Sequence, residues 1–138
     1  MFLSTFNNNL DDKNRFVLPK EYRNILTDNT FIAFRSYNND AIDCFSSERM
    51  KKLIEKVDNE MDILSNSREN FETAVFADAM ILKFDKVGRV VMPDILKEYA
   101  GIEKNFVIVG KGSTFQIWEP SKFKEYQELA KAALKKGK

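Results

Sequence analysis

Two arginine residues, Arg15 and Arg89, occur in the same local setting and are the side chains best suited to recognise an anion. Each lies four residues after an aspartate, Asp11 or Asp85, and precedes a short apolar stretch that ends in a proline. A planar guanidinium can donate two parallel hydrogen bonds to phosphate oxygens or to the O6/N7 edge of guanine. The spacing of these residue types therefore points to nucleic-acid recognition, with the aspartates orienting the arginines.

The residues between each aspartate and arginine are typical of a tight turn. Aspartate suits the first position of such a turn, and Asn14 and Gly88 tolerate the positive φ expected at its last position. Segments 15–18 and 89–92 contain β-branched or large apolar residues and are predicted to form short strands. We therefore expect each arginine at a hairpin tip, directed away from the core. An approximate two-fold between the two copies would place both arginines on one face.

The chain is predicted to be a tandem duplication. After each motif, the sequence pattern predicts a short helix, an apolar strand, a polar turn, a second strand and a helix. Between segments 10–23 and 84–97, four residue pairs are identical at an offset of 74 residues (89 − 15). The identical pairs are Asp11 and Asp85, Arg15 and Arg89, Val17 and Val91, and Pro19 and Pro93.

A length of 138 residues suits one compact domain or two small halves that share a core. We predict a first repeat in residues 1–53, a helical connector in 54–78, a second repeat in 79–126 and a basic C-terminal helix or tail in 127–138. Apolar residues at helical spacing predict an amphipathic helix from about residue 47 to 64, and a second helix before the next strand.

The composition excludes several classes of protein. The charges of 22 Lys+Arg and 21 Asp+Glu nearly cancel, and there is no histidine to act as a general base or metal ligand. The single cysteine, Cys44, has no partner for an intrachain disulfide. No apolar run approaches the roughly 20 residues that cross a bilayer. We therefore expect a cytoplasmic protein without a metal site, a cofactor or a membrane partner.

The segments 11–19 (Asp-Asp-Lys-Asn-Arg-Phe-Val-Leu-Pro) and 85–93 (Asp-Lys-Val-Gly-Arg-Val-Val-Met-Pro) resemble the paired signature of MraZ proteins. These proteins are two-repeat relatives of the AbrB/SpoVT swapped-hairpin DNA-binding domains, and the resemblance covers nearly the whole chain. It implies a β-rich α+β fold, in which tandem pseudo-symmetric AbrB/SpoVT-like halves form one interleaved small β-barrel flanked by helices.

The resemblance also implies a function. Members of this family form ring-shaped homo-oligomers and bind short direct repeats in double-stranded promoter DNA. They regulate the operon for cell division and cell-wall synthesis, which commonly includes their own gene. A nucleoid-associated transcription regulator without catalytic residues is therefore expected.

The candidate site residues follow from the motifs and from their basic neighbours. The family usually has glycine where this chain has Asn14, and arginine where it has Lys97, so a bidentate contact at position 97 becomes a point charge. The expected DNA-binding residues are Arg15, Arg89, Lys13, Lys86, Lys20, Arg23 and Lys97, and the turn-forming residues are Asp11, Asn14, Asp85 and Gly88.

Two other functions are open from the sequence. In an interaction module or antitoxin-like scaffold, the lysine-rich tail or segment 65–71 would capture another protein. In an enzyme, Asp11, Asp12 and Asp85 would hold a divalent metal for phosphodiester chemistry, because carboxylates are suitable ligands for Mg²⁺. These acids lie in separate turns beside basic residues, with no nucleophile or base nearby, so we expect the protein not to be an enzyme.

Overall fold

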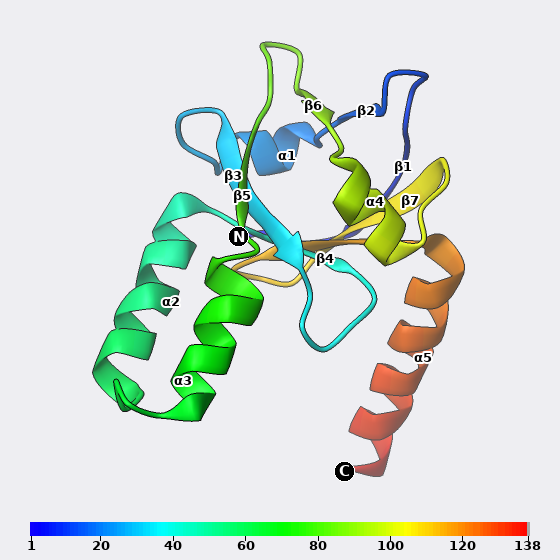
Figure 1. Cartoon of the computed structure of the whole chain (residues 1–138). Coiled ribbons are helices and arrows are strands. Elements are labelled where there is room, and N and C mark those ends of the chain that lie inside the picture. The colour runs from blue at the N-terminus through cyan, green and yellow to red at the C-terminus, as the bar shows by residue number, and fades with distance from the viewer. Residues whose placement is uncertain (138) are drawn as a thin grey trace.

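Residues 1–137, which the computed structural model describes, form strands and helices in a regular alternation (Figure 1). The strands are β1 (Thr5–Asn9), β2 (Arg15–Val17), β3 (Thr30–Arg35), β4 (Ile42–Phe45), β5 (Met80–Lys83), β6 (Arg89–Val91), β7 (Asn105–Gly110) and β8 (Phe115–Trp118). The α-helices are α1 (Lys20–Arg23), α2 (Ser47–Glu60), α3 (Asn66–Phe71), α4 (Asp94–Ala100) and α5 (Pro120–Lys136), and a π-helical segment, η1, covers Glu72–Phe76.

The elements of the two halves follow the same order. The first half runs β1, β2, α1, β3, β4 and α2, and the second half runs β5, β6, α4, β7, β8 and α5. Strands β2 and β6 begin 74 residues apart (89 − 15), as do helices α1 and α4 (94 − 20). The order of elements expected after each motif is therefore present in both halves, with α3 and η1 inserted between them.

Strands of the two halves interleave in one antiparallel sheet of six strands, in the order β1-β7-β8-β4-β3-β5. Strand β1 pairs with β7 of the second half, and β5 pairs in the equivalent way with β3 of the first half. The equivalent strands β4 and β8 pair with each other, and so do β2 and β6 in a separate ribbon. Each half therefore completes the sheet of the other.

The expected closed barrel is not found. Among residues 1–137, β1 and β5 are the two edges of the six-stranded sheet and do not pair with each other. After each of these strands the chain turns, at residues 11–14 and 85–88, and leaves the sheet as β2 or β6. The β2–β6 ribbon therefore links the two edges through these turns rather than through a continuous ladder.

The inward face of the ribbon is fixed in the main apolar core. Phe16 of β2 and Val90 of β6 are 2% and 1% exposed, and both belong to the largest buried cluster. The ring of Phe16 packs edge-on against Phe106 of β7, with a centroid distance of 5.2 Å. Burial of a large aromatic side chain is a substantial stabilising contribution, so the ribbon cannot rotate freely relative to the sheet.

The helical connector differs from the prediction at its centre. Helix α2 ends at Glu60 rather than near residue 64, and a short turn leads into α3. Ser65 caps α3 by accepting a hydrogen bond from the backbone N–H of Arg68 at 3.1 Å. Serine and aspartate favour caps and turns over helix interiors, so this polar cap outweighs the apolar periodicity that predicted a longer helix. The second expected helix is present as α3 and η1.

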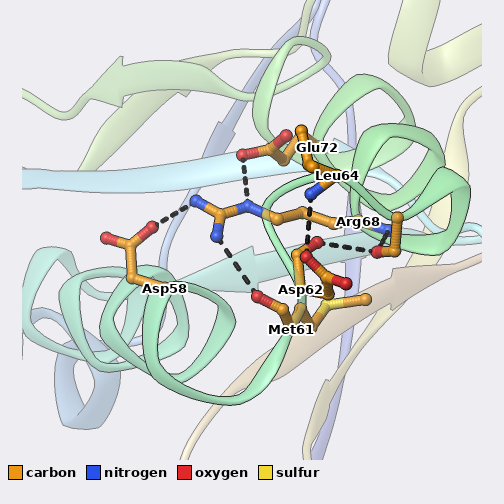
Figure 2. Close-up of polar contacts among 7 residues, drawn as sticks. Asp58, Met61, Asp62, Leu64, Arg68 and Glu72 are labelled. Atoms are coloured by element: carbon orange, nitrogen blue, oxygen red, sulfur yellow. Dashed lines mark hydrogen bonds and ion pairs between the residues drawn. The ribbon is translucent and has the colours of Figure 1, made fainter.

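One arginine connects the two helices of the connector (Figure 2). The Nη2 atom of Arg68 lies 2.7 Å from Oδ1 of Asp58, and its Nη1 donates to the carbonyl of Met61 at 3.3 Å. Its Nε donates to Glu72 at 3.3 Å, and its side chain is only 14% exposed. The α2–α3 hairpin is therefore held as one unit. No helix in the described part of the chain is long and apolar enough to cross a membrane.

Candidate nucleic-acid interface

The carboxylate of Asp11 organises the first turn. Its Oδ1 accepts hydrogen bonds from the backbone N–H groups of Lys13 and Arg15, both at 2.9 Å, and its Oδ2 accepts from Nε of Arg15 at 2.8 Å. Asn14 has a φ of 58° and donates its backbone N–H to the carbonyl of Asp11 at 3.0 Å. One aspartate therefore shapes the turn and orients the arginine.

The second turn repeats this geometry. Oδ1 of Asp85 accepts from the backbone N–H groups of Val87 at 3.1 Å and Arg89 at 2.9 Å, and its Oδ2 accepts from Nε of Arg89 at 2.8 Å. Gly88 has a φ of 91° at the position equivalent to Asn14. The positive φ predicted at both positions is present.

Both aspartates are held in the ionised form. The hydrogen bond from the backbone N–H of Arg15, followed by the one from its guanidinium, lowers the pKa of Asp11. The corresponding bonds from Arg89 lower the pKa of Asp85. Within the described residues, each of the two guanidiniums uses only its Nε in a hydrogen bond. The terminal nitrogens Nη1 and Nη2 are thus available to an external acceptor.

The register of the ribbon places both arginines on one face. Side chains of directly paired residues lie on the same face of an antiparallel pair, and faces alternate along each strand. The central pair of the ribbon is buried, whereas the two outer pairs point to solvent. The paired residues are Arg15 and Val91, Phe16 and Val90, and Val17 and Arg89.

The arginine-bearing face is open to solvent. The side chains of Arg15 and Arg89 are 33% and 47% exposed, and the valines beside them, Val17 and Val91, are 48% and 58% exposed. Figure 1 shows both turns at the same end of the molecule, beyond the sheet and away from α2, α3 and the end of α5. The two guanidiniums therefore share one exposed surface, as the repeat predicted.

A shallow hollow of about 150 Å³ lies between the two arginines. Two asparagines of β1, Asn8 and Asn9, contribute to it, and Asn8 donates its side-chain amide to the carbonyl of Val17 at 2.8 Å. The motif did not include these residues. Their signal in the sequence is the run of three asparagines at 7–9, just before the first turn.

The remaining basic candidates fall into two groups. Lys13, Lys86 and Lys20 are exposed on or beside the turns. By contrast, Arg23 and Lys97 are half-buried and make contacts within the protein. Nε of Arg23 donates to the carbonyl of Leu18 at 3.0 Å, and Nζ of Lys97 donates to the side-chain oxygen of Asn14 at 3.2 Å.

The carboxylates are not arranged as a metal site. Across residues 1–137, no three His, Cys, Asp or Glu side chains lie close enough together to hold a metal ion. Asp11 and Asp85 instead accept the hydrogen bonds of their own turns. The geometry is suited to presenting two guanidiniums rather than to holding a cation.

Comparison of the sequence with known proteins identifies the family of this chain. Residues 75–137 match the model of a family described as "MraZ protein, putative antitoxin-like". A Rickettsia bellii protein named transcriptional regulator MraZ is 41% identical over 130 residues, which cover 91% of this chain and 86% of that protein. This chain belongs to the MraZ family.

Two further MraZ relatives match over both repeats. The Rickettsia felis protein is 38% identical over 133 residues, which cover 94% of this chain and 89% of its own length. The Pelagibacter ubique protein is 35% identical over 130 residues, with 92% and 83% covered. Both are named transcriptional regulator MraZ. The MraZ resemblance inferred from the two turn motifs is confirmed.

Proposed function

We propose that this MraZ-family protein is a transcription regulator that binds double-stranded promoter DNA through the exposed face of the β2–β6 ribbon. The observation that carries the proposal is the pair of guanidiniums, each oriented by a carboxylate, on one solvent-facing side of that ribbon. The major groove of B-DNA admits a two-stranded ribbon, and the guanidinium fork matches the O6 and N7 acceptors of guanine. Arg15 and Arg89 are therefore the proposed base-reading residues.

The exposed lysines around the ribbon suit the DNA backbone. Lys13 and Lys86 lie at the turn tips, and Lys20 begins α1 shortly after Leu18, whose backbone N–H is bonded to Gly88 of the second turn. Contacts of this kind position a protein on the duplex and make its affinity depend on salt. Arg23 and Lys97 lie behind the turns and contact the protein itself, so they are not proposed as phosphate contacts.

Binding by a single copy is expected to be weak, because the chain carries a formal net charge of only +1. We propose that a ring-shaped homo-oligomer binds several short direct repeats at once, which raises the overall affinity without new contacts. The expected repeats lie in the promoter of the cell-division and cell-wall operon, including its own gene. The protein would accordingly be nucleoid-associated.

Two features of the α2–α3 hairpin support head-to-tail assembly. Ile63 and Leu64, at the hairpin tip, are 76% and 88% exposed. A separate hollow of about 280 Å³ on the side of the hairpin is lined in part by Leu53, Val57 and Phe71. An apolar projection that docks on a different surface of the next copy forms a ring when the rotation closes. Copies arranged in this way present their ribbons in the same direction, which suits direct rather than inverted repeats.

The proposal is tested by titrating the full-length protein with DNA from upstream of its own gene and with scrambled DNA of equal length. We expect a preference for the upstream DNA, and a binding constant that falls linearly with salt concentration on logarithmic axes. The mass of the free protein should exceed that of one chain. Equal affinity for both DNAs would contradict sequence-specific regulation.

A protein-interaction or antitoxin-like role is the second candidate. Helix α5 carries lysines along its length, and its apolar residues Leu129 and Leu134 are 64% and 72% exposed. A pull-down from nuclease-treated lysate separates the two functions. Stoichiometric capture of one protein that is lost in a Leu129→Asp/Leu134→Asp variant would favour the second candidate.

A further inference from the structure

We propose that Arg23 and Lys97 are positioning residues that form a crosswise clasp, in which each half of the protein holds the arginine-bearing turn of the other half. The clasp consists of two contacts, Arg23 on Gly88 and Lys97 on Asn14. The inference rests on the proposed function, because these two turns carry Arg15 and Arg89, which we propose to contact DNA.

The second turn is held by the first half. A Cβ atom built on Gly88 would lie 2.7 Å from Nε of Arg23 and 2.8 Å from its Cδ and Cζ, so the guanidinium rests directly on the glycine. The same Nε donates to the carbonyl of Leu18 at 3.0 Å, and the N–H of Leu18 donates to the carbonyl of Gly88 at 2.9 Å. Arg23 thus packs on the second turn, to which Leu18 of the first half is also hydrogen-bonded.

The first turn is held by the second half in the equivalent way. Nζ of Lys97 donates to the side-chain oxygen of Asn14 at 3.2 Å, and the amide of Asn14 lies 3.4 Å from Oδ1 of Asp94. The backbone N–H of Met92 donates to the carbonyl of Asn14 at 2.8 Å. This last bond is the counterpart of the one between Leu18 and Gly88.

The two contacts are matched in size. Arg23 and Lys97 are 74 residues apart (97 − 23), as are Asn14 and Gly88 (88 − 14), so each contact joins equivalent positions. The larger guanidinium faces the glycine, which leaves room for it, and the narrower ammonium faces the asparagine, which accepts its hydrogen bond. Any side chain at position 88 would occupy the space of the guanidinium. We therefore infer that neither Arg23 nor Lys97 can be replaced by the other type of cation unless the residue that it contacts, Gly88 or Asn14, is changed as well.

The residues held by the clasp are next in sequence to the two arginines that we propose to contact DNA. Asn14 immediately precedes Arg15, whose N–H and Nε both bond to Asp11. A change in the position of the turn therefore changes the direction of the guanidinium. Arg23 and Lys97 act on DNA binding through this geometry, whereas a residue in contact with phosphate would act through its charge.

Amide hydrogen exchange on the free protein tests the clasp without DNA. In Lys97→Ala we expect faster exchange in residues 11–15 and unchanged exchange in 85–89, and in Arg23→Ala the reverse. Lys52→Ala, an exposed lysine on α2, is the matched control and should change neither turn. Faster exchange in both turns, or only in the turn of the altered half, would overturn the proposal. Since this measurement needs no DNA, it stands or falls separately from the proposed function.

A charge-preserving exchange tests the matched sizes. Residues in direct contact are energetically coupled, so Lys97→Arg should weaken DNA binding by about tenfold, and the double variant Asn14→Gly/Lys97→Arg should recover most of the loss. Lys52→Arg should have no effect. If Lys97→Arg binds as tightly as the unaltered protein with either residue at position 14, the clasp is wrong.

The salt dependence separates positioning from direct contact. Loss of one phosphate contact reduces the slope of log affinity against log salt by about one. Lys97→Ala and Arg23→Ala should lower the affinity and leave this slope unchanged. A reduced slope in either variant would identify that residue as a phosphate contact and refute the positioning role.

Discussion

Removal of the ribbon guanidiniums should reduce DNA affinity without loosening the fold. Each of Arg15 and Arg89 uses only its Nε inside the described part of the protein, which leaves two terminal nitrogens for one bidentate pair with a guanine. Such a pair contributes about 1–3 kcal/mol, or roughly 5- to 150-fold in affinity. We expect Arg15→Ala and Arg89→Ala each to lose an amount in this range, and the double variant to lose more than either.

Replacement by lysine distinguishes base recognition from charge. Arg15→Lys keeps the charge and removes the fork, so discrimination between specific and scrambled DNA should fall while the salt slope is maintained. Fluorescence anisotropy at several salt concentrations measures both quantities, with Lys52→Ala as the control. Neither arginine is buried, so the melting temperature should remain close to that of the unaltered protein. Unchanged affinity and specificity in Arg15→Ala would refute its role as a base-reading residue.

Three further predictions concern the ribbon register, the assembly of copies and the pH dependence of stability. Phe16→Ala on the inner face of the ribbon should lower the free energy of unfolding in urea by about 3–5 kcal/mol, whereas Val17→Ala on the outer face should lower it by less than about 1 kcal/mol; equal losses would contradict the ribbon register. Leu64→Asp at the hairpin tip should reduce the mass of the assembly measured by native mass spectrometry while leaving the circular dichroism spectrum unchanged, and an undiminished mass would exclude the tip as an interface. Burial raises the pKa of Tyr22 to about 12, so its neutral phenol stabilises the fold fully below the unfolded-state value of about 10, and this contribution is lost as pH rises toward 12. Tyr22→Phe should remove that alkaline loss, and an identical pH profile would contradict this assignment.

The arginine-bearing turns could be predicted because their geometry depends on residues that are close in sequence. Asp11 bonds to groups two and four positions later, and the positive φ at Asn14 requires a residue that adopts it readily. The internal repeat added the second copy. The local pattern did not identify which side of the strand faces the core, since Phe16 is buried whereas Val17 is 48% exposed. The shared face of Arg15 and Arg89 followed from these local features and the assumed two-fold.

The features that were predicted wrongly, or not predicted at all, depend on contacts between distant segments. The closed barrel was wrong because the turns carry the chain away from both edge strands, which no local pattern reports. The early end of α2 reflects a competition between apolar spacing and the cap at Ser65. The contacts of Arg23 and Lys97 join residues 65 and 83 positions apart (88 − 23 and 97 − 14), so the sequence showed only two basic residues near a basic motif.

The interleaving of the two halves in the sheet has a consequence during protein synthesis. Thr5 pairs with Val109, so β1 lacks its neighbour until the ribosome has made more than 100 further residues (109 − 5 = 104). Long-range pairing of this kind slows folding and leaves incomplete chains exposed to aggregation and proteolysis. A prematurely terminated chain that carries the first arginine turn would still lack the strands that order it. The proposed DNA-binding surface can therefore form only once translation of the chain is nearly complete.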